Sequence, residues 1–264
     1  MSTVRSTALW CAICLLSTGC EQWISAFTGQ ETGDEVAFGD GTARTYLEMD
    51  DHGNPVELGV AFGTRFDALP DGALEVRLDL PMDTPAVLPV DHAVLRWRPE
   101  GHEPELAYGL PHVDVRFLLL DADEVGEIAE GDCEGSGLTC DALERADRPL
   151  AKVAHPPGHA ALGVYEPGEG AVLFDLFAPE VMGAMFELGW TYARFDGRVS
   201  SFGAEAARGW LETLTDETCI GVTTPDAFPR AGWYPTTVCA SWGGDGQYRV
   251  SLRDFERFTS AGAL

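Results

Sequence analysis

Basic residues are scarce in this chain of 264 residues. Lysine and arginine together number 17 against 43 aspartate and glutamate residues, which gives a formal net charge of −26, and Lys152 is the single lysine. A protein that binds nucleic acid or an anionic lipid surface needs basic patches that neutralise phosphates. The scarcity of such residues excludes nucleic acid as an expected partner, and it predicts an acidic, solvated surface.

Motifs of common nucleotide-binding and nucleophilic enzymes are also missing. The chain has no G-x-S-x-G elbow, no P-loop and no Rossmann glycine pattern. The acidic runs at residues 48–51 and 121–124 lack the spacing of an EF-hand loop, so we interpret them as solvated turns. These absences favour a non-enzymatic protein over an enzyme.

Long apolar runs are absent as well. The apolar run at residues 7–16 has about half of the roughly 20 residues that a membrane-spanning helix needs. It follows Arg5 and precedes three small residues and Cys20, which is the layout of a bacterial lipoprotein signal. We therefore predict a signal peptide over residues 1–19 and a membrane anchor through lipid on Cys20. The alternative is an ordinary secretory signal with a chance cysteine.

This signal predicts where the protein resides and how it is divided. We expect a location in the cell envelope, with the outer membrane favoured over the inner membrane or secretion. Residues 20–41 are polar and rich in glycine, so they read as a flexible tether. A single domain over residues 42–264 follows.

Four of the seven cysteines come after Cys20. An even number in an oxidising compartment predicts disulfides, whereas zinc binding through cysteines would need paired C-x-x-C spacing, which the sequence lacks. Pairing between neighbours in the sequence is the simplest arrangement. The predicted disulfides are Cys133–Cys140 and Cys219–Cys239.

Short alternating stretches separated by turn signals dominate the chain from Thr42 onward. Asp196-Gly197, between two such stretches, is the strongest hairpin signal. Many short strands with frequent turns predict a mainly β fold, a β-sandwich or a barrel-like domain, with a few short helices. The predicted strands are 43–49, 56–62, 73–80, 93–98, 113–120, 160–165, 171–177, 191–195, 198–202, 236–242 and 248–252.

Helix signals are fewer. An apolar stripe of helical spacing predicts a helix over residues 204–214, and two-turn helices are expected at 123–129 and 179–186. We expect the tail, residues 252–258, to be a strand that runs into a short helix.

Two histidines and an aspartate form the most promising chemical pattern. On a strand, residues 112, 114 and 116 point to the same side, so His112, Asp114 and Arg116 would stand in a row. His112 and Asp114 are potential metal ligands, and His102 could join them from the preceding loop. Spacing alone favours the plainer alternative, which is a polar, hydrogen-bonded outer face of a sheet.

These segments carry a resemblance to a known family. Residues 101–104 and 111–117, with the later segments 174–180, 194–202, 233–236 and 248–252, are similar to the motifs of the TTHB210-like family, also called DUF5602. The resemblance spans roughly residues 45–258. It implies a shared fold, and the relatives suggest a homo-oligomer. The residues that match the family site and would hold a divalent metal are His102, His112, Asp114 and Glu180.

The chain departs from the family pattern at two histidine positions, which are Arg116 and about Val172. An arginine beside a cation repels it, so Arg116 could instead pair with Asp114 or Glu180 and replace the metal by a salt bridge. We therefore expect an exported, lipid-anchored, non-enzymatic binding or structural module without a cofactor, with an envelope protein or a second copy as partner. The alternative is a metal-binding protein or metal-dependent enzyme that uses the His/Asp/Glu cluster.

Overall fold

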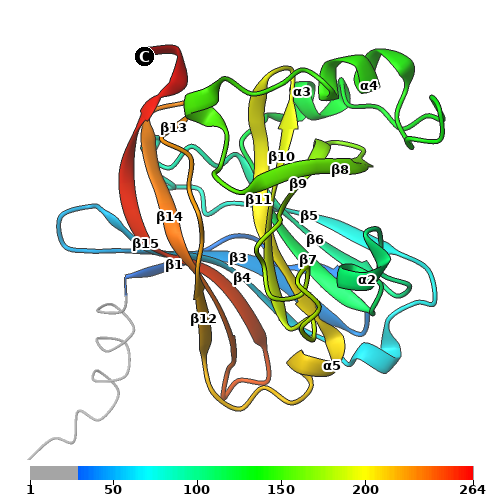
Figure 1. The fold of residues 1–264 in the computed structure, drawn as a ribbon. Helices are drawn as coiled ribbons and strands as arrows, with labels where there is room; N and C mark the ends of the chain where they lie inside the picture. Colours follow the sequence, from blue (N-terminus) through cyan, green and yellow to red (C-terminus); the bar gives the residue numbers. More distant parts are fainter. Residues whose placement is uncertain (1–28, 264) are drawn as a thin grey trace, which may run out of the picture.

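Two β-sheets pack against each other as a sandwich in the computed structural model, which describes residues 29–263 (Figure 1). Sheet A contains β1 (Gln30–Thr32), β2 (Val36–Phe38), β3 (Gly41–Met49), β4 (Pro55–Gly63), β12 (Thr218–Gly221), β14 (Gly232–Trp242) and β15 (Tyr248–Ser260), with β13 (Ala227–Phe228) attached in parallel to β15. Sheet B contains β5 (Leu74–Asp79), β6 (His92–Arg98), β7 (His112–Leu118), β8 (His159–Glu166), β9 (Gly170–Asp175), β10 (Leu188–Phe195) and β11 (Arg198–Ala207). The predicted mainly β fold is confirmed, and it is a sandwich rather than a closed barrel.

Strand order places the chain's distant parts side by side. Sheet A runs β1-β3-β4-β15-β14-β12, and sheet B runs β5-β6-β7-β11-β10-β9-β8. In both sheets a late strand lies between earlier ones, because β15 pairs with β4 and β11 pairs with β7. The inward side chains of both sheets form one large apolar core, to which β7 contributes Val113, Val115 and Phe117.

All eleven predicted strands are present. Some, such as β5, alternate apolar and polar residues, and others, such as β9, are short apolar runs. The prediction of a flexible tether over residues 20–41 is wrong for its second half. There, β1 and β2 pair with β3, and Phe38 is fully buried in the core. The predicted signal peptide, Cys20 and the first part of the tether lie outside the described residues.

The helix predicted over residues 204–214 is mostly wrong. Strand β11 continues through Ala207, and α5 covers only Arg208–Leu211. Ala204 and Ala206 face the core, and the ladder with β7 extends to the end of β11, so sheet pairing overrides the helical propensity of alanine. Residues 179–186 form turns instead of a helix, and the tail stays extended as β15 before the short η3 (Ala261–Ala263).

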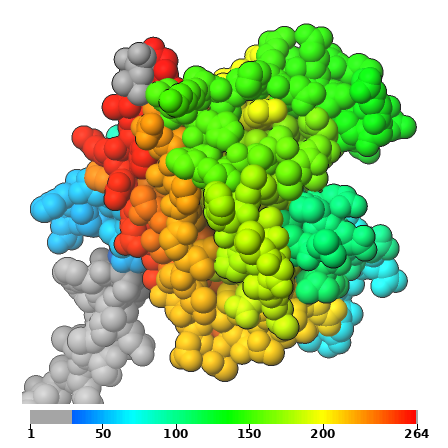
Figure 2. Space-filling model, in the orientation of Figure 1, coloured from blue at the N-terminus to red at the C-terminus, as the bar shows by residue number. Residues whose placement is uncertain are grey.

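The remaining helices lie outside the sandwich. The expected helix near residue 123 is present as α3 (Ala122–Gly126), and α2 (Glu105–Tyr108) and α4 (Cys140–Ala146) were not predicted. Around α3 and α4 the chain stands out from the sandwich at one end (Figure 2). It packs on β9 and β10 through a small apolar core that includes Ala171 and Phe195. Within residues 29–263, no helix has both the length and the apolar character to cross a membrane.

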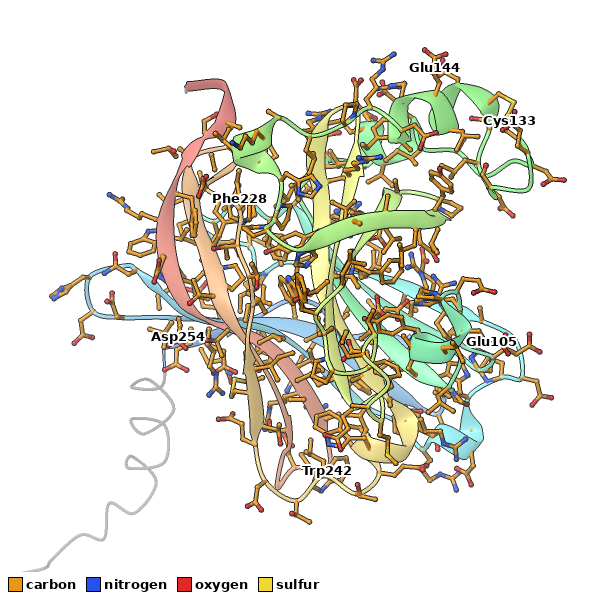
Figure 3. All side chains as sticks on the ribbon, viewed as in Figure 1. Glu105, Cys133, Glu144, Phe228, Trp242 and Asp254 are labelled. Carbon is orange, nitrogen blue, oxygen red and sulfur yellow. A yellow bond between two sulfur atoms is a disulfide. The ribbon has the colours of Figure 1, made fainter. Side chains whose placement is uncertain are left out.

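Both predicted disulfides are confirmed. Cys133–Cys140 closes the loop that leads into α4, where Cys133 lies at the outer end of the projecting segment (Figure 3). Cys219–Cys239 joins directly opposed residues of β12 and β14, so it ties an edge strand to its neighbour.

Candidate metal site

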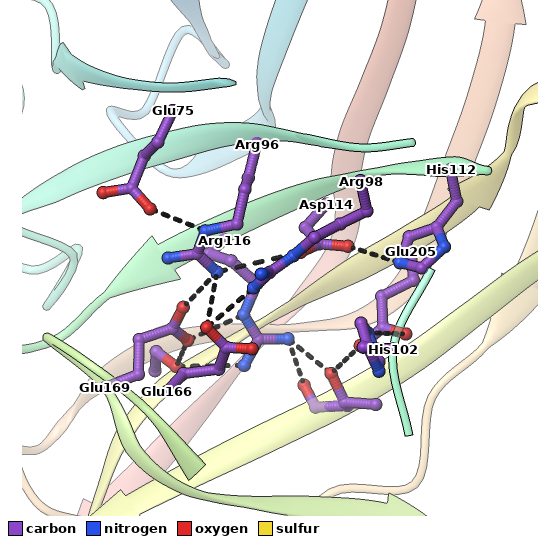
Figure 4. Close-up of polar contacts among 12 residues, drawn as sticks. Glu75, Arg96, Arg98, His102, His112, Asp114, Arg116, Glu166, Glu169 and Glu205 are labelled. Carbon is purple, nitrogen blue, oxygen red and sulfur yellow. Dashed lines mark hydrogen bonds and ion pairs between the residues drawn. The ribbon is translucent and has the colours of Figure 1, made fainter. Parts of the chain in front are cut away.

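The outer face of sheet B, away from the core, carries a buried polar cluster. Strand alternation turns His112, Asp114 and Arg116 of β7 to this face, as predicted. The loop after β6, which contains α2, and the turn between β8 and β9 cover the cluster (Figure 4). The face is polar and hydrogen-bonded, as the alternative interpretation held, but it is buried, since Asp114 and Arg116 are each 3% exposed.

Four possible ligands meet at one end of this cluster. They are His102 from the covering loop, His112 and Asp114 from β7, and Glu205 from β11, whose ligand atoms all lie within 4.8 Å of one another. His112 Nε2 is 3.1 Å from Asp114 Oδ1, and His102 Nε2 is 3.5 Å from Glu205 Oε2. Zinc bonds of about 2.0 Å at tetrahedral angles place ligand atoms about 3.3 Å apart, so these spacings fit one ion with little movement.

Both histidines are oriented for metal binding. Nδ1 of His102 lies 2.7 Å from the carbonyl oxygen of Glu103, and Nδ1 of His112 lies 2.7 Å from that of Leu110. A carbonyl oxygen only accepts, so Nδ1 carries the proton in each ring, and a neutral imidazole then presents the Nε2 lone pair to the cluster. This second hydrogen bond is the arrangement that metal-ligating histidines use.

Each carboxylate likewise has one oxygen occupied and one oxygen free. Arg98 Nε donates to Asp114 Oδ2 at 3.1 Å, and Thr191 Oγ1 donates to Glu205 Oε1 at 2.8 Å. The other oxygens, Asp114 Oδ1 and Glu205 Oε2, are buried together with His112 Nε2. Among the described residues they face the ligand atoms of this same group, because His112 Nε2 lies 3.1 Å from Asp114 Oδ1 and His102 Nε2 lies 3.5 Å from Glu205 Oε2. Buried polar atoms need partners, and these four point toward one another, so the donor set fits a bound cation.

Charge is balanced around this group. Arg98 pairs with Glu166 at 2.7 Å and Arg116 with Glu169 at 2.8 Å. Arg96 pairs with Glu75 at 2.6 Å and with Glu169 at 3.1 Å. Asp114 pairs with Arg98 as well, at 3.1 Å. Three guanidinium groups therefore stand against five carboxylates, those of Glu75, Glu166, Glu169, Asp114 and Glu205, and the excess of two negative charges matches one divalent cation bound by neutral histidines.

The surroundings shift the pKa values of the site strongly. Burial alone would lower the pKa of His102, but the charge of Glu205 outweighs burial and raises it to about 9. Burial would raise the pKa of Asp114, yet His112, Arg98 and Arg96 together hold that pKa well below its usual value. His102 thus carries a proton at neutral pH unless a cation takes its place at Nε2.

Glu180, predicted as the fourth ligand, is not part of the group. Its Oε1 accepts a hydrogen bond of 2.9 Å from the hydroxyl of Tyr108, and burial raises its pKa. Tyr108 stacks on His102 with ring centroids 5.5 Å apart, so Glu180 contacts the site only through a covering aromatic residue. Glu205 takes its place.

The sequence analysis missed Glu205 because it assigned that residue to a helix. The segment Ser201 to Ala207 alternates in the pattern of a strand, and Glu205 lies directly opposite Asp114 on β7. If Ala204-Glu205-Ala206 is assigned to a strand, the two alanines face the core and the carboxylate of Glu205 points to the opposite face. This alternation is the sequence signal that could have identified Glu205.

The predicted salt bridge of Arg116 is present but with another partner. Its Nε donates to Glu169 Oε2, and it also contacts Thr191 and Ser201, so the expected pairing with Asp114 or Glu180 is wrong. The expectation that Arg116 would repel a cation left out Glu169. This glutamate lies in the turn before β9, is buried beside Arg116, and compensates its positive charge.

Little free volume remains around the cluster. The cavity between the covering segments and the arginines measures about 10 Å³. That volume holds about one water molecule, and a substrate needs a pocket of roughly 300 Å³ or more. The arrangement therefore suits an enclosed ion.

Comparison with protein-family models, with curated proteins and with solved structures finds no match to this chain. The resemblance to the TTHB210-like family therefore stays a prediction.

Proposed function

We propose that this protein is a non-enzymatic module of the cell envelope that holds one zinc-type divalent cation as an internal cross-link. The observation that carries the proposal is the convergence of His102, His112, Asp114 and Glu205, whose ligand atoms all lie within 4.8 Å of one another and face one another at the buried end of the cluster. Two neutral histidines and two carboxylates compensate the charge of such an ion.

The identity of the ion follows from the donors. Imidazole nitrogens favour zinc and its neighbours over Mg²⁺ and Ca²⁺, which take six or more oxygen ligands. Four single-atom donors in a tight cluster suit tetrahedral zinc, whereas Cu²⁺ and Ni²⁺ prefer square-planar or tetragonal sites.

A structural role is supported by the closure of the site. Structural zinc sites are closed by four protein ligands, and catalytic sites keep one position open for water or substrate. Here four protein ligands and a cavity of about 10 Å³ leave no such position. The ion would link the covering loop, through His102, to β7 and β11, and so hold the loop on the sheet.

The cellular setting stays a proposal from the sequence. We propose lipid attachment at Cys20 as the anchor, and an envelope protein or a second copy as the partner. The two disulfides support an oxidising compartment, where such bonds persist.

The metal content of the full chain, purified without chelators and measured by mass spectrometry, tests the proposal. We expect about one zinc per chain in the parent and in His159→Ala, a buried histidine outside the group, and less than a tenth in His112→Ala. Excess zinc should also raise the melting temperature of the parent, because an ion at 100 times its Kd contributes about 2.7 kcal/mol. A parent that takes up no zinc even after loading, or a His112→Ala protein that retains it, contradicts the proposal.

A further inference from the structure

Thr191 touches the proposed metal site through a ligand rather than directly. It lies on β10 with no exposed surface, and its Oγ1 donates a hydrogen bond of 2.8 Å to Glu205 Oε1. The same oxygen accepts a hydrogen bond from Arg116 Nη1. Thr191 therefore stands between the arginine network and the carboxylate of Glu205.

Arg116 fixes the direction in which the Thr191 hydroxyl donates. A guanidinium group only donates, so the Thr191 oxygen must accept from Arg116 and direct its one hydrogen elsewhere. Glu205 Oε1 is the acceptor in reach. Gly203 pairs with Arg116 on one side and with Thr191 on the other, and the absence of a side chain there lets Arg116 cross β11.

The hydrogen bonds from Arg116 to Thr191 and from Thr191 to Glu205 leave Glu205 with one free oxygen. Oε1 is occupied by Thr191, and Oε2 faces the other ligand atoms. Arg98 limits Asp114 in the same way. With two monodentate carboxylates, two histidines and space for about one water, the site offers four donor atoms, fewer than larger cations take.

We infer that Thr191, oriented by Arg116, is the positioning residue that makes Glu205 a monodentate ligand and so sets the preference of the site for four-coordinate zinc over six-coordinate Mn²⁺. The inference rests on the proposed function, because it concerns the same site. Without the hydroxyl, Glu205 is free to rotate and to offer both oxygens, which suits a higher coordination number.

The experiment compares the full chain with Thr191→Val and Thr191→Ser. Affinities for Zn²⁺ and Mn²⁺ are measured by competition with a chromophoric chelator, and the visible spectrum of bound Co²⁺ reports coordination number, since tetrahedral Co²⁺ absorbs much more strongly than six-coordinate Co²⁺. Thr45→Val is the matched control. Thr45 is also fully buried and donates one hydrogen bond, to the carbonyl of Asp79, but it lies in sheet A.

We expect Thr191→Val to bind zinc 10–100-fold more weakly, the range for loss of a partner behind a metal ligand. Its Mn²⁺ affinity should hold or rise, and its Co²⁺ spectrum should lose intensity. Thr191→Ser and Thr45→Val should retain the parent's zinc affinity and spectrum.

Two other outcomes are informative. A Thr191→Val protein with the parent's zinc affinity and Co²⁺ spectrum overturns the inference and leaves the proposed function standing. Loss of zinc and Mn²⁺ affinity by the same factor also overturns it, because the residue would then be structural only. A parent that binds no zinc contradicts the proposed function, and the inference with it.

Discussion

Arg116 shows how one buried charge is accommodated at the level of single residues. Its guanidinium makes an ion pair with Glu169 and hydrogen bonds to Thr191 and Ser201, and the residue is 3% exposed. A buried ion pair adds little by itself, because desolvation opposes the attraction, but removal of one partner leaves an uncompensated charge. Arg116 and Glu169 therefore depend on each other.

Substitution Arg116→Leu should lower the free energy of unfolding by about 3–5 kcal/mol, because it leaves Glu169 buried without its main partner. Arg44→Leu is the matched control. Arg44 pairs with Glu35 at 2.8 Å on the surface, and loss of such a pair costs about 0–1 kcal/mol. Urea titration measures both. If both variants lose the same unfolding free energy, burial does not make the Arg116–Glu169 pair more important to stability than a surface pair.

Residues near in sequence were predictable, and residues brought by distant strands were not. His112, Asp114 and Arg116 follow from the two-residue period of a strand, and His102 from its nearness in the chain. Glu205 and Glu169 come from later segments whose register with β7 no local pattern encodes. The sequence therefore predicted three of the four grouped ligands and missed the charge that compensates Arg116.

At the level of elements, the two disulfides constrain segments of different size. Cys219–Cys239 has a sequence separation of 20 and holds β12 at the edge of sheet A, whereas Cys133–Cys140 has a separation of 7 and closes a surface loop. A longer closed loop removes more entropy from the unfolded chain. The pairing was predictable because each cysteine's nearest neighbour in sequence is also its neighbour in space.

Replacement of Cys219 and Cys239 by alanine should cost about 3 kcal/mol, and replacement of Cys133 and Cys140 about 2 kcal/mol, according to this loop-closure entropy. Unfolding in urea gives the two values. Amide hydrogen exchange should also speed up in β12 for the first variant only. The reverse order of stability, or unchanged exchange in β12, would contradict this account.

The positions of most strands could be predicted from the sequence, but where the strands begin and end could not. The segment around Ala204 and Ala206 has strong helical propensity, and only its ladder with β7 makes it a strand. β1 and β2 lie in a segment rich in polar residues and glycine, yet they pair with β3. In both cases the deciding partner lies elsewhere in the chain.

At the level of the whole molecule, two electrostatic effects oppose each other in acid. At neutral pH the net charge is −26, so the excess carboxylates on the surface repel one another. Protonation of these carboxylates in acid relieves the repulsion. The buried network behaves in the opposite way. Burial alone would raise the pKa of Glu169, but Arg116, Arg96 and Ser201 lower it from 4.5 to about 2.

A folded-state pKa below the unfolded value means that the stabilisation by Glu169 is complete above about pH 4.5 and disappears as the pH falls toward 2. The shift corresponds to about 3 kcal/mol. We expect the parent to exceed Glu169→Gln in unfolding free energy by about this amount at pH 6, and the difference to vanish near pH 2. Comparison of the two proteins cancels the surface repulsion that they share. A difference that stays constant with pH would rule out this role for Glu169.

The position of β15 has a consequence for the order of assembly. β15 lies between β4 and β14, although it follows both in the chain. While the polypeptide emerges from the ribosome, β3 and β4 must therefore wait for β15 before sheet A is continuous, and until then β4 exposes an open edge that invites pairing with other chains. Until β15 has emerged, a nascent chain of this design remains incompletely folded, which is the state in which a polypeptide is still able to thread through a narrow translocation channel.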